Sequence, residues 1–332
     1  MTHQYGTPEL AHVPVFRDRV RDLLLPALQS SAAVCVDATV GAGGHSQALL
    51  AAVDGLRVVG IDRDTDALAL TGDRLAQYGD RFTGVHAVYD EIPAVLAELG
   101  IESVDAVLFD LGVSSMQLDV AGRGFAYARD APLDMRMDQS SGITAADIVN
   151  DYDPADLTRV LREFGEERFA SRIARAIAAR RAKARITSSS ELAELVRDAV
   201  PAATRRHGGH PAKRTFQALR IEVNAELDVL RRALPAAMDV LRPGGRIAVL
   251  SYQSLEDRIV KREFATRSTS SAPVGLPIDV PGTEPTFRLL TRGAQPPSEA
   301  EIDANPRAAS AKLRAAEKLT DRTGHSRGED ES

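Results

Sequence analysis

The sequence predicts an α/β fold in which helices cover both faces of a mostly parallel sheet that a helical insertion interrupts. Two observations predict this class. Short apolar, β-branched runs alternate with helical patterns through the first third of the chain, and that alternation is typical of parallel sheets. After Asp110 the alternation stops, loop and helix patterns follow, and a strand signal returns at Arg246–Ser251. The insertion therefore lies between the fourth and fifth strands.

The elements follow from local patterns, taken in chain order. The expected strands are Ala33–Val40, Arg57–Asp62, Thr83–Val88, Val104–Asp110, Arg246–Ser251 and a last one near Thr286–Thr291. The expected helices of the insertion are Tyr152–Phe164, Phe169–Lys183 and Glu191–Val200. Ser188, with Glu191 three residues later, predicts a capping box before the last of these. Ser268–Pro285 reads as a loop. The expected domains are 1–122 and 216–322 for the two parts of the α/β domain, 123–215 for the insertion, and 323–332 for a disordered tail.

Composition excludes several classes of protein. The chain has 332 residues, of which 44% are hydrophobic and 27% charged, as expected for a globular protein with a sizeable core. Cys35 is the only cysteine, so an intrachain disulfide and a thiolate zinc cluster are both excluded, and we expect a cytoplasmic protein. The first ten residues lack the apolar segment of a secretory signal, and no apolar run is long enough to span a membrane.

Charge is distributed unevenly. The net charge is −6, yet the 55 residues from Glu166 to Arg220 hold 13 Lys and Arg against 5 Asp and Glu. Within this basic segment, Arg168, Arg172, Arg175 and Lys183 fall within about 80° of each other at roughly 100° per residue, beside an apolar seam of Phe169, Ile173 and Ile177. A solvated helical surface is one interpretation. A surface for the nucleic-acid backbone is the other.

A glycine-rich turn follows the first expected strand, within Asp37–Ser46. Glycines let the backbone approach a ligand, and the free amides of a helix N-terminus favour carboxylates or phosphates. A purely structural tight turn is the alternative. Ser46 stands where the dinucleotide fingerprint requires its third glycine, which argues against a dehydrogenase.

Two carboxylates end strands of the predicted sheet. Asp62 closes the second strand, where it can accept hydrogen bonds from both hydroxyls of a ribose. It can also cap the following helix, and the two roles are compatible. Asp110 closes the fourth strand and lies over the switch point of the sheet, where a cofactor and an acceptor would meet.

Three further segments carry polar residues. In Pro132–Asp138, apolar and charged residues alternate, which indicates an edge strand or an amphipathic loop, or else a lid whose charges face a polar ligand. His207 and His210 lack a third nearby ligand, so we expect no metal there and favour a basic loop that contacts phosphate. Ser254 is the expected cap of a helix that starts after the fifth strand.

Together these segments closely resemble the ribosomal RNA small subunit methyltransferase H family, also called MraW, whose members are bacterial cytosine-N4 methyltransferases. The segments that carry the resemblance are His12–Val15, Asp37–Ser46, Asp110–Ser115, Gln117–Asp119, Arg123–Phe125, Pro132–Asp138, Phe164–Arg168, Phe216–Ile221, Ser254–Arg258, Asn305–Arg307 and Ser310–Arg314. They span most of the chain.

The resemblance implies a class I methyltransferase fold, Rossmann-like, with S-adenosylmethionine as cofactor. The implied cofactor-binding residues are Gly43, Gly44, His45, Asp62 (ribose), Tyr89 (adenine), Asp110 and Gln117. The family usually has Phe where this chain has Tyr89, which preserves a ring for stacking. It usually reads Ser-Phe-His-Ser where this chain reads Ser251-Tyr252-Gln253-Ser254, so a histidine there cannot be the general base.

The implied reaction methylates the exocyclic amine of a cytidine in 16S rRNA, at the decoding centre of the small ribosomal subunit. Asp110 is the candidate acceptor of that amine's hydrogen bonds, and Phe125 or Tyr127 could stack on the base. The acceptor base must leave its stack to react, and the basic insertion would hold the RNA backbone. The candidate substrate-binding residues are Phe125, Asp134, Arg136, Arg172, Arg175, His210, Lys213 and Arg214. A homodimer is compatible with the sequence. An NAD-dependent oxidoreductase and a non-catalytic RNA-binding assembly factor are the competing hypotheses.

Overall fold

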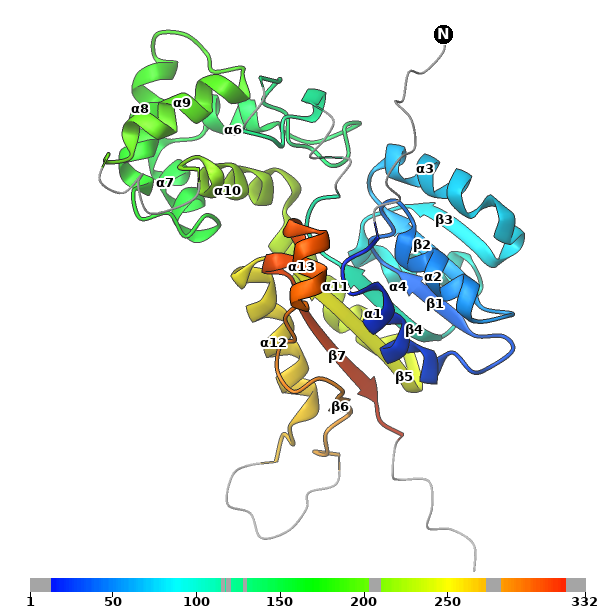
Figure 1. The fold of residues 1–332 in the computed structure, drawn as a ribbon. Coiled ribbons are helices and arrows are strands. Elements are labelled where there is room, and N and C mark those ends of the chain that lie inside the picture. Colours follow the sequence, from blue (N-terminus) through cyan, green and yellow to red (C-terminus); the bar gives the residue numbers. More distant parts are fainter. Residues whose placement is uncertain are drawn as a thin grey trace, which may run out of the picture. The chain divides into compact units, whose positions relative to one another are not determined.

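The computed structural model describes residues 13–114, 117, 121–127, 130–202, 210–272 and 282–320. The chain forms two compact units, which Figure 1 shows in blue to cyan and yellow to red for the first and mainly in green for the second. The first consists of Met1–Asp62, Asp66–Gly112 and Arg232–Ser332, and the second of Arg63–Thr65 and Val113–Arg231. The predicted insertion at 123–215 lies within the second unit. His207 and the predicted tail at 323–332 lie outside the described residues.

A sheet forms the centre of the first unit. Among the described residues it has seven strands in the order β3-β2-β1-β4-β5-β7-β6. The strands are β1 (Val34–Asp37), β2 (Arg57–Asp62), β3 (Phe82–His86), β4 (Val104–Asp110), β5 (Leu241–Ser251), β6 (Phe287–Leu289) and β7 (Lys312–Lys318). The first five pair in parallel, whereas β7 runs antiparallel to both β5 and β6. The predicted α/β class with a mostly parallel sheet is confirmed.

Both faces of the sheet are covered. Consecutive residues of β4 from Val104 to Phe109 are all buried, and a strand buried on both faces is typical of sheets with helices on each side. On one face, Leu24 of α1 and Leu49 and Leu50 of α2 pack with alternate residues of the strands. The helices of this unit are α1 (Arg17–Leu24), α2 (Gly44–Ala52), α3 (Thr65–Leu75), α4 (Ile92–Glu98), α11 (Glu226–Asp239), α12 (Ser254–Ser268) and α13 (Glu299–Ala304), of which α3 and α11 each begin with residues of the second unit.

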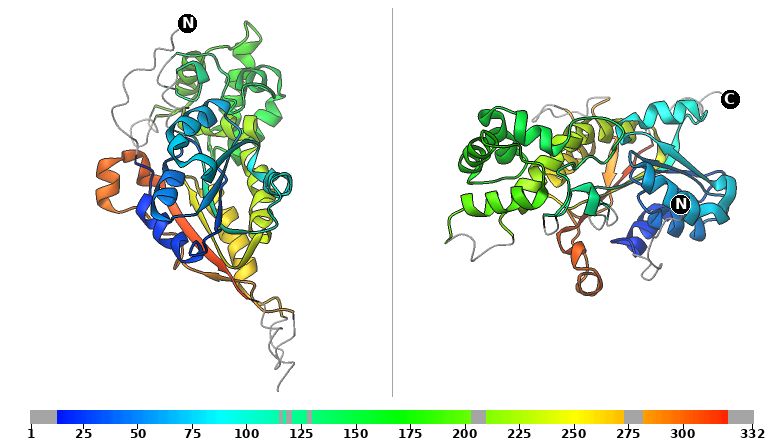
Figure 2. Two further views of the ribbon diagram at one scale, coloured as in Figure 1. Left: turned by 90° about the vertical axis from the view of Figure 1, so that its right-hand side faces the viewer. Right: turned by 90° about the horizontal axis from the view of Figure 1, so that it is seen from above.

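Distant segments meet beside α1. The backbone N–H of Phe16, which precedes α1, donates to Glu301 of α13 at 2.8 Å, and both views of the ribbon place the two helices side by side (Figures 1 and 2). This hydrogen bond links the start of the described chain to a helix about 285 residues later in the sequence.

Helices and irregular segments build the second unit around an apolar core of their own. Its helices are α6 (Ala145–Asp151), α7 (Pro154–Glu163), α8 (Ala170–Arg181), α9 (Ser189–Ala199) and α10 (Lys213–Asn224). In α8, Ile173 and Ile177 are fully buried while Arg172 and Arg175 are exposed. The predicted apolar seam beside a basic stripe is therefore confirmed.

Three local expectations need correction. Ser254 is the first residue of α12 and Gln253 is its N-cap, because the carboxylate of Glu256 accepts the N–H groups of Tyr252 and Gln253. Only half of the predicted capping box forms: Ser188 accepts from Glu191 N, whereas the Glu191 carboxylate pairs with Arg180.

Two further observations concern strands. Of the alternatives for 132–138, the amphipathic loop is the one that forms: burial alternates along the segment, but Met135 has φ = 63° and only Pro132 makes an isolated bridge. The third correction is strand β7, which was not predicted, because its return beside β5 depends on antiparallel pairing across about 60 residues of sequence.

Candidate active site

The site begins where β1, β2 and β4 end. Asp37, Asp62 and Asp110 are the last residues of these three strands. The strands are neighbours in the parallel sheet, so their carboxyl ends share one edge, which is where open α/β sheets bind ligands. The His45 side chain lies near the carboxylates of both Asp37 and Asp110.

The glycine-rich turn connects β1 to α2. Gly43 has φ = 75°, and a Cβ at this position would lie 2.9 Å from Thr71 Cγ2, so the turn requires glycine here. The N–H of Gly41 donates to Asp62 Oδ2 at 2.9 Å. The sequence predicted that Asp62 lies beside the glycine-rich turn, and the structure shows a direct hydrogen bond between them. Asp62 lies three residues before the first residue of α3, so it does not occupy the capping position of that helix.

Asp37 and His45 form the buried floor of the site. Asp37 is 1% exposed and accepts a hydrogen bond from Ser46 Oγ at 2.7 Å. Burial raises the pKa of Asp37 above its ordinary value, although the Ser46 hydrogen bond opposes that shift. His45 is 6% exposed, and its Nε2 has no hydrogen-bond partner among the described residues. That nitrogen lies 3.6 Å from Asp110 Oδ2.

Asp110 is held by residues that follow the ends of β1 and β5. Its backbone N–H donates to Thr39 Oγ1 at 2.7 Å, and its Oδ1 accepts a hydrogen bond from the Tyr252 hydroxyl at 2.9 Å. The Asp110 side chain is 26% exposed, so the carboxylate can be reached by a ligand. Sequence reasoning missed Tyr252. The signal was present, since the chain has a hydroxyl where the family usually has Phe.

Tyr89 lies in a short 3₁₀ turn, Tyr89–Glu91, after β3. Its ring packs edge-on against Phe109 of β4, with 5.6 Å between ring centroids and 86° between planes. The ring is half-buried and has a defined orientation, as a residue that stacks on a base requires.

Gln117 belongs to the second unit, and its side chain is already bonded there. Its Nε2 donates to Asp64 Oδ2 at 2.8 Å, and its Oε1 accepts from Ser114 N at 3.1 Å. Arg123 joins the same buried group through Asp64 at 2.9 Å. That Asp64 and Arg123 form a charged pair that is almost fully buried is visible only in the structure.

The remaining candidate residues lie in the second unit in three settings. Phe125 is 7% exposed within the apolar core. Asp134 and Arg136 are partly buried and bind each other, so much of their charge is neutralised within the pair. Arg172, Arg175, Lys213 and Arg214 are exposed.

His210 is exposed and stacks on Tyr127, with 4.5 Å between ring centroids and 18° between planes. Its Nδ1 accepts the N–H of Ala212 at 3.2 Å. This hydrogen bond and the stack fix the ring at the start of α10.

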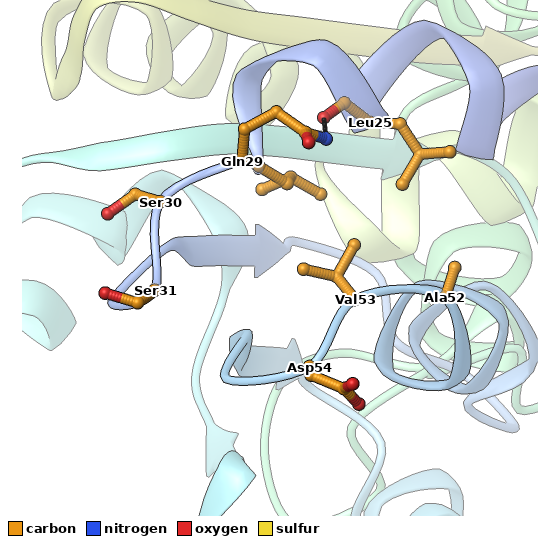
Figure 3. A pocket seen from close by; sticks show the side chains of 8 residues that line it. Leu25, Gln29, Ser30, Ser31, Ala52, Val53 and Asp54 are labelled. Carbon is orange, nitrogen blue, oxygen red and sulfur yellow. Dashed lines mark hydrogen bonds between the residues drawn. The ribbon is translucent and has the colours of Figure 1, made fainter.

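A pocket elsewhere in the first unit is separate from these residues (Figure 3). It is lined by Leu25, Leu28, Gln29, Ser30, Ser31, Ala52, Val53 and Asp54. Ser31 precedes β1 and Asp54 precedes β2, so the pocket lies at the amino ends of these strands, opposite the edge that carries Asp37 and Asp62.

The described ranges contain neither a metal-ligand cluster nor a helix suited to span a membrane. Within them, no three His, Cys, Asp or Glu side chains converge as a metal site would require. No helix in the same ranges has the length and apolar character that crossing a bilayer demands.

The residues at this edge of the sheet fit S-adenosylmethionine. A carboxylate beside the glycine turn suits ribose hydroxyls, and the ring of Tyr89 suits adenine. The unpartnered Nε2 of buried His45 and the exposed part of Asp110 supply polar groups for the reacting end. These are groups of the chemical types that the cofactor requires.

Comparison with known proteins identifies the family. Residues 9–319 match the model of the MraW methylase family. Ribosomal RNA small subunit methyltransferase H of Saccharopolyspora erythraea is 63% identical over 314 residues, which cover 95% of each chain. The proteins of the same name from Thermobifida fusca and Mycolicibacterium smegmatis are 62% and 59% identical, covering 94% of this chain and 95% and 85% of theirs. The predicted resemblance is confirmed, and the dehydrogenase hypothesis is set aside. The chain belongs to the MraW methylase family and is a methyltransferase that uses S-adenosylmethionine.

Proposed function

We propose that this protein methylates the exocyclic N4 amine of a cytidine in 16S rRNA, at the decoding centre of the small ribosomal subunit. The names of its relatives support rRNA of the small subunit as the substrate. The observation that carries the proposal is the carboxylate of Asp110, held at the end of β4 between Tyr252 and His45 with one oxygen bonded and the other left for a substrate.

The cofactor-binding residues follow from their positions. The amides of Gly44 and His45 at the start of α2 receive the amino-acid end, and Gly43, whose own N–H donates to Val40 O at 2.7 Å, forms the turn that presents them. Asp62 receives the ribose and Tyr89 the adenine. Gln117 is a further cofactor-binding residue that the family resemblance proposes. When bound, the cofactor supplies an electrophilic methyl group on a positively charged sulfur.

Asp110 compensates for the low nucleophilicity of the cytidine amine that accepts the methyl group. The exocyclic amine of cytosine is a weak nucleophile, because its lone pair is delocalised into the ring. A carboxylate that accepts an N–H hydrogen bond both orients the amine and increases its electron density. As the nitrogen gains the methyl group it loses one proton, and Asp110 Oδ2 is the group positioned to accept that proton.

The second unit binds the RNA. Exposed cations of the insertion, predicted at 123–215, contact phosphates, and these contacts position the substrate without reading its sequence. The proposed contacts are Arg172, Arg175, His210, Lys213 and Arg214, with Tyr127 or Phe125 for stacking and Asp134 and Arg136 for polar contacts. Of the two rings, Tyr127 has more of its surface accessible.

The test uses methyl-labelled S-adenosylmethionine and small ribosomal subunits that lack this modification. Digestion of the RNA and mass analysis of the labelled nucleoside should yield N4-methylcytidine. Naked 16S rRNA in a parallel reaction distinguishes an assembled substrate from a free one. An unlabelled product, from protein that binds S-adenosylhomocysteine, would favour the non-catalytic assembly factor and contradict the proposal.

Asp110→Asn tests the role of the carboxylate in the same assay. We expect turnover to fall about 10²-fold or more at saturating substrates, the range in which general bases contribute. Asp54→Asn, at the opposite end of the sheet, is the matched control and should keep wild-type turnover. Full activity of Asp110→Asn would remove Asp110 from the mechanism.

A further inference from the structure

Tyr252 contacts Asp110 because two neighbouring strands end together. In the parallel pair β4 and β5, Asp110 lies opposite Leu250, and Tyr252 follows two residues later. Its ring packs against the apolar core on one face of the sheet. The hydroxyl therefore emerges beside the Asp110 carboxylate, where it donates to Oδ1 at 2.9 Å.

The hydroxyl can act here only as a donor. Burial, and next the negative charge of Asp110, raise the pKa of Tyr252 far above its ordinary value. The phenol therefore keeps its proton at neutral pH. A hydrogen bond from a neutral donor favours the ionised form of a carboxylate.

Other charged and titratable groups surround Asp110. His45 of α2 faces Oδ2 at 3.6 Å, and Asp37 of β1 lies near enough for each negative charge to disfavour the other. Glu256 of α12 is turned to the backbone N–H groups of Tyr252 and Gln253.

We propose that Tyr252 is a positioning residue of the methyl-transfer site: its hydroxyl occupies Asp110 Oδ1, keeps the carboxylate ionised, and leaves Oδ2 to accept the amine hydrogen. The effect on catalysis rests on the proposed function, whereas the effect on Asp110 itself does not. Tyr252 acts through Asp110 and does not touch the substrate.

The first experiment needs neither cofactor nor RNA. Protein carrying ¹³C-carboxyl aspartate is titrated by NMR, and the resonance missing in Asp110→Asn is assigned to Asp110. In Tyr252→Phe we expect the midpoint of this titration to move about 1 pH unit higher, as losing one hydrogen bond to a charged group predicts. An unmoved midpoint overturns the proposal even if the RNA substrate is misidentified.

The second experiment measures turnover of small subunits against pH. In Tyr252→Phe the acid limb should move upward by the same amount as the NMR midpoint, while turnover on the alkaline plateau stays within about threefold of wild type. An equal loss at every pH would indicate a merely structural hydroxyl and would contradict the proposal. Wild-type protein that methylates no small-subunit RNA would contradict the proposed function instead.

The matched control is Tyr152→Phe. Tyr152 in the second unit also donates to a carboxylate, Glu222 Oε1, at 3.0 Å, so the control removes the same kind of bond. It should leave both the Asp110 midpoint and the acid limb unchanged. In the Asp110→Asn background, Tyr252→Phe should cause no further shift of the acid limb, since the group it acts on no longer titrates. A further shift there would show that Tyr252 acts on another group.

Discussion

At the scale of single residues, the turn after β1 shows how backbone conformation can require a particular amino acid. Gly43 sits in the left-handed region, and Thr71 of α3 fills the space beside its α-carbon. Any side chain here meets both a conformational penalty and a steric contact. The turn proposed to bind the cofactor therefore depends on the missing Cβ.

We expect Gly43→Ala to lower the free energy of unfolding by about 1–2 kcal/mol, the cost of a left-handed conformation for an L-residue. It should also weaken the binding of S-adenosylhomocysteine, because the turn must shift. Urea denaturation and titration calorimetry measure the two effects.

Gly72→Ala is the control for this variant. No atom lies within 4 Å of a Cβ built at Gly72, which is in α3, so alanine there should stabilise by about 0.5–1 kcal/mol. Equal behaviour of the two variants would show that the conformation of Gly43 is not what the turn requires.

At the scale of elements, α8 has one apolar face and one basic face. Its buried face holds Ile173 and Ile177 in the core of the second unit, and its exposed face carries Arg172 and Arg175. Helical spacing predicted both faces from the sequence, because the periodicity of an α-helix is local. The ligand of the basic face is not encoded in that periodicity.

We expect the double variant Arg172→Gln and Arg175→Gln to weaken RNA binding and to reduce the slope of log K against log salt by about 0.7–0.9 for each phosphate that the variant no longer neutralises. Affinity for S-adenosylhomocysteine should be unchanged. Fluorescence anisotropy of a labelled 16S rRNA fragment at several salt concentrations measures the slope.

Arg197→Gln with Arg231→Gln removes the same amount of charge from arginines that already pair with Asp198 and Asp228. If this control changes the salt slope as much as the α8 variant does, the basic face of α8 has no special role in RNA binding.

At the scale of the whole first unit, ion pairs join segments far apart in the sequence. Arg314 of β7 binds both carboxylate oxygens of Asp257 in α12, at 2.8 and 3.2 Å. Partial burial disfavours the charged carboxylate, but the hydrogen bond and charge of Arg314, assisted by Lys312, outweigh burial and lower the pKa of Asp257. The pair fixes α12 against a strand that sequence patterns did not predict.

Asp257→Asn should therefore lower the free energy of unfolding by about 1–2 kcal/mol at pH 7, the range for a hydrogen-bonded charged pair. Because the folded-state pKa is depressed, the stabilisation is present above the ordinary pKa of aspartate, about 3.9, and disappears as the pH falls through the lower folded-state pKa. Urea denaturation from pH 7 to pH 3 should show the two proteins converging at low pH.

Asp18→Asn is the matched control, since the Asp18 carboxylate is solvent-exposed beside Arg17 and Arg21. Water screens that pair, so its loss should change stability little at any pH. A constant difference between wild type and Asp257→Asn across the pH range would contradict the assigned role of the charge.

Features that depend on local patterns, such as strand boundaries and helix faces, could be predicted from the sequence. Strands β2 and β4 begin and end at the predicted residues, and the basic and apolar faces of α8 follow from helical spacing. The motifs were also enough to predict the family and its cofactor. Each of these signals lies within a short window, where side-chain periodicity and residue type suffice.

Contacts between residues far apart in the sequence became visible only in the tertiary structure. Strand β7 pairs with β5, which ends about 60 residues earlier, and the Tyr252 hydroxyl reaches Asp110 across 142 residues of sequence. The buried group of Asp64, Arg123 and Gln117 is likewise assembled from separate segments. No local pattern encodes such contacts, because they arise from strand register and from the need to pair buried charges once the chain is packed.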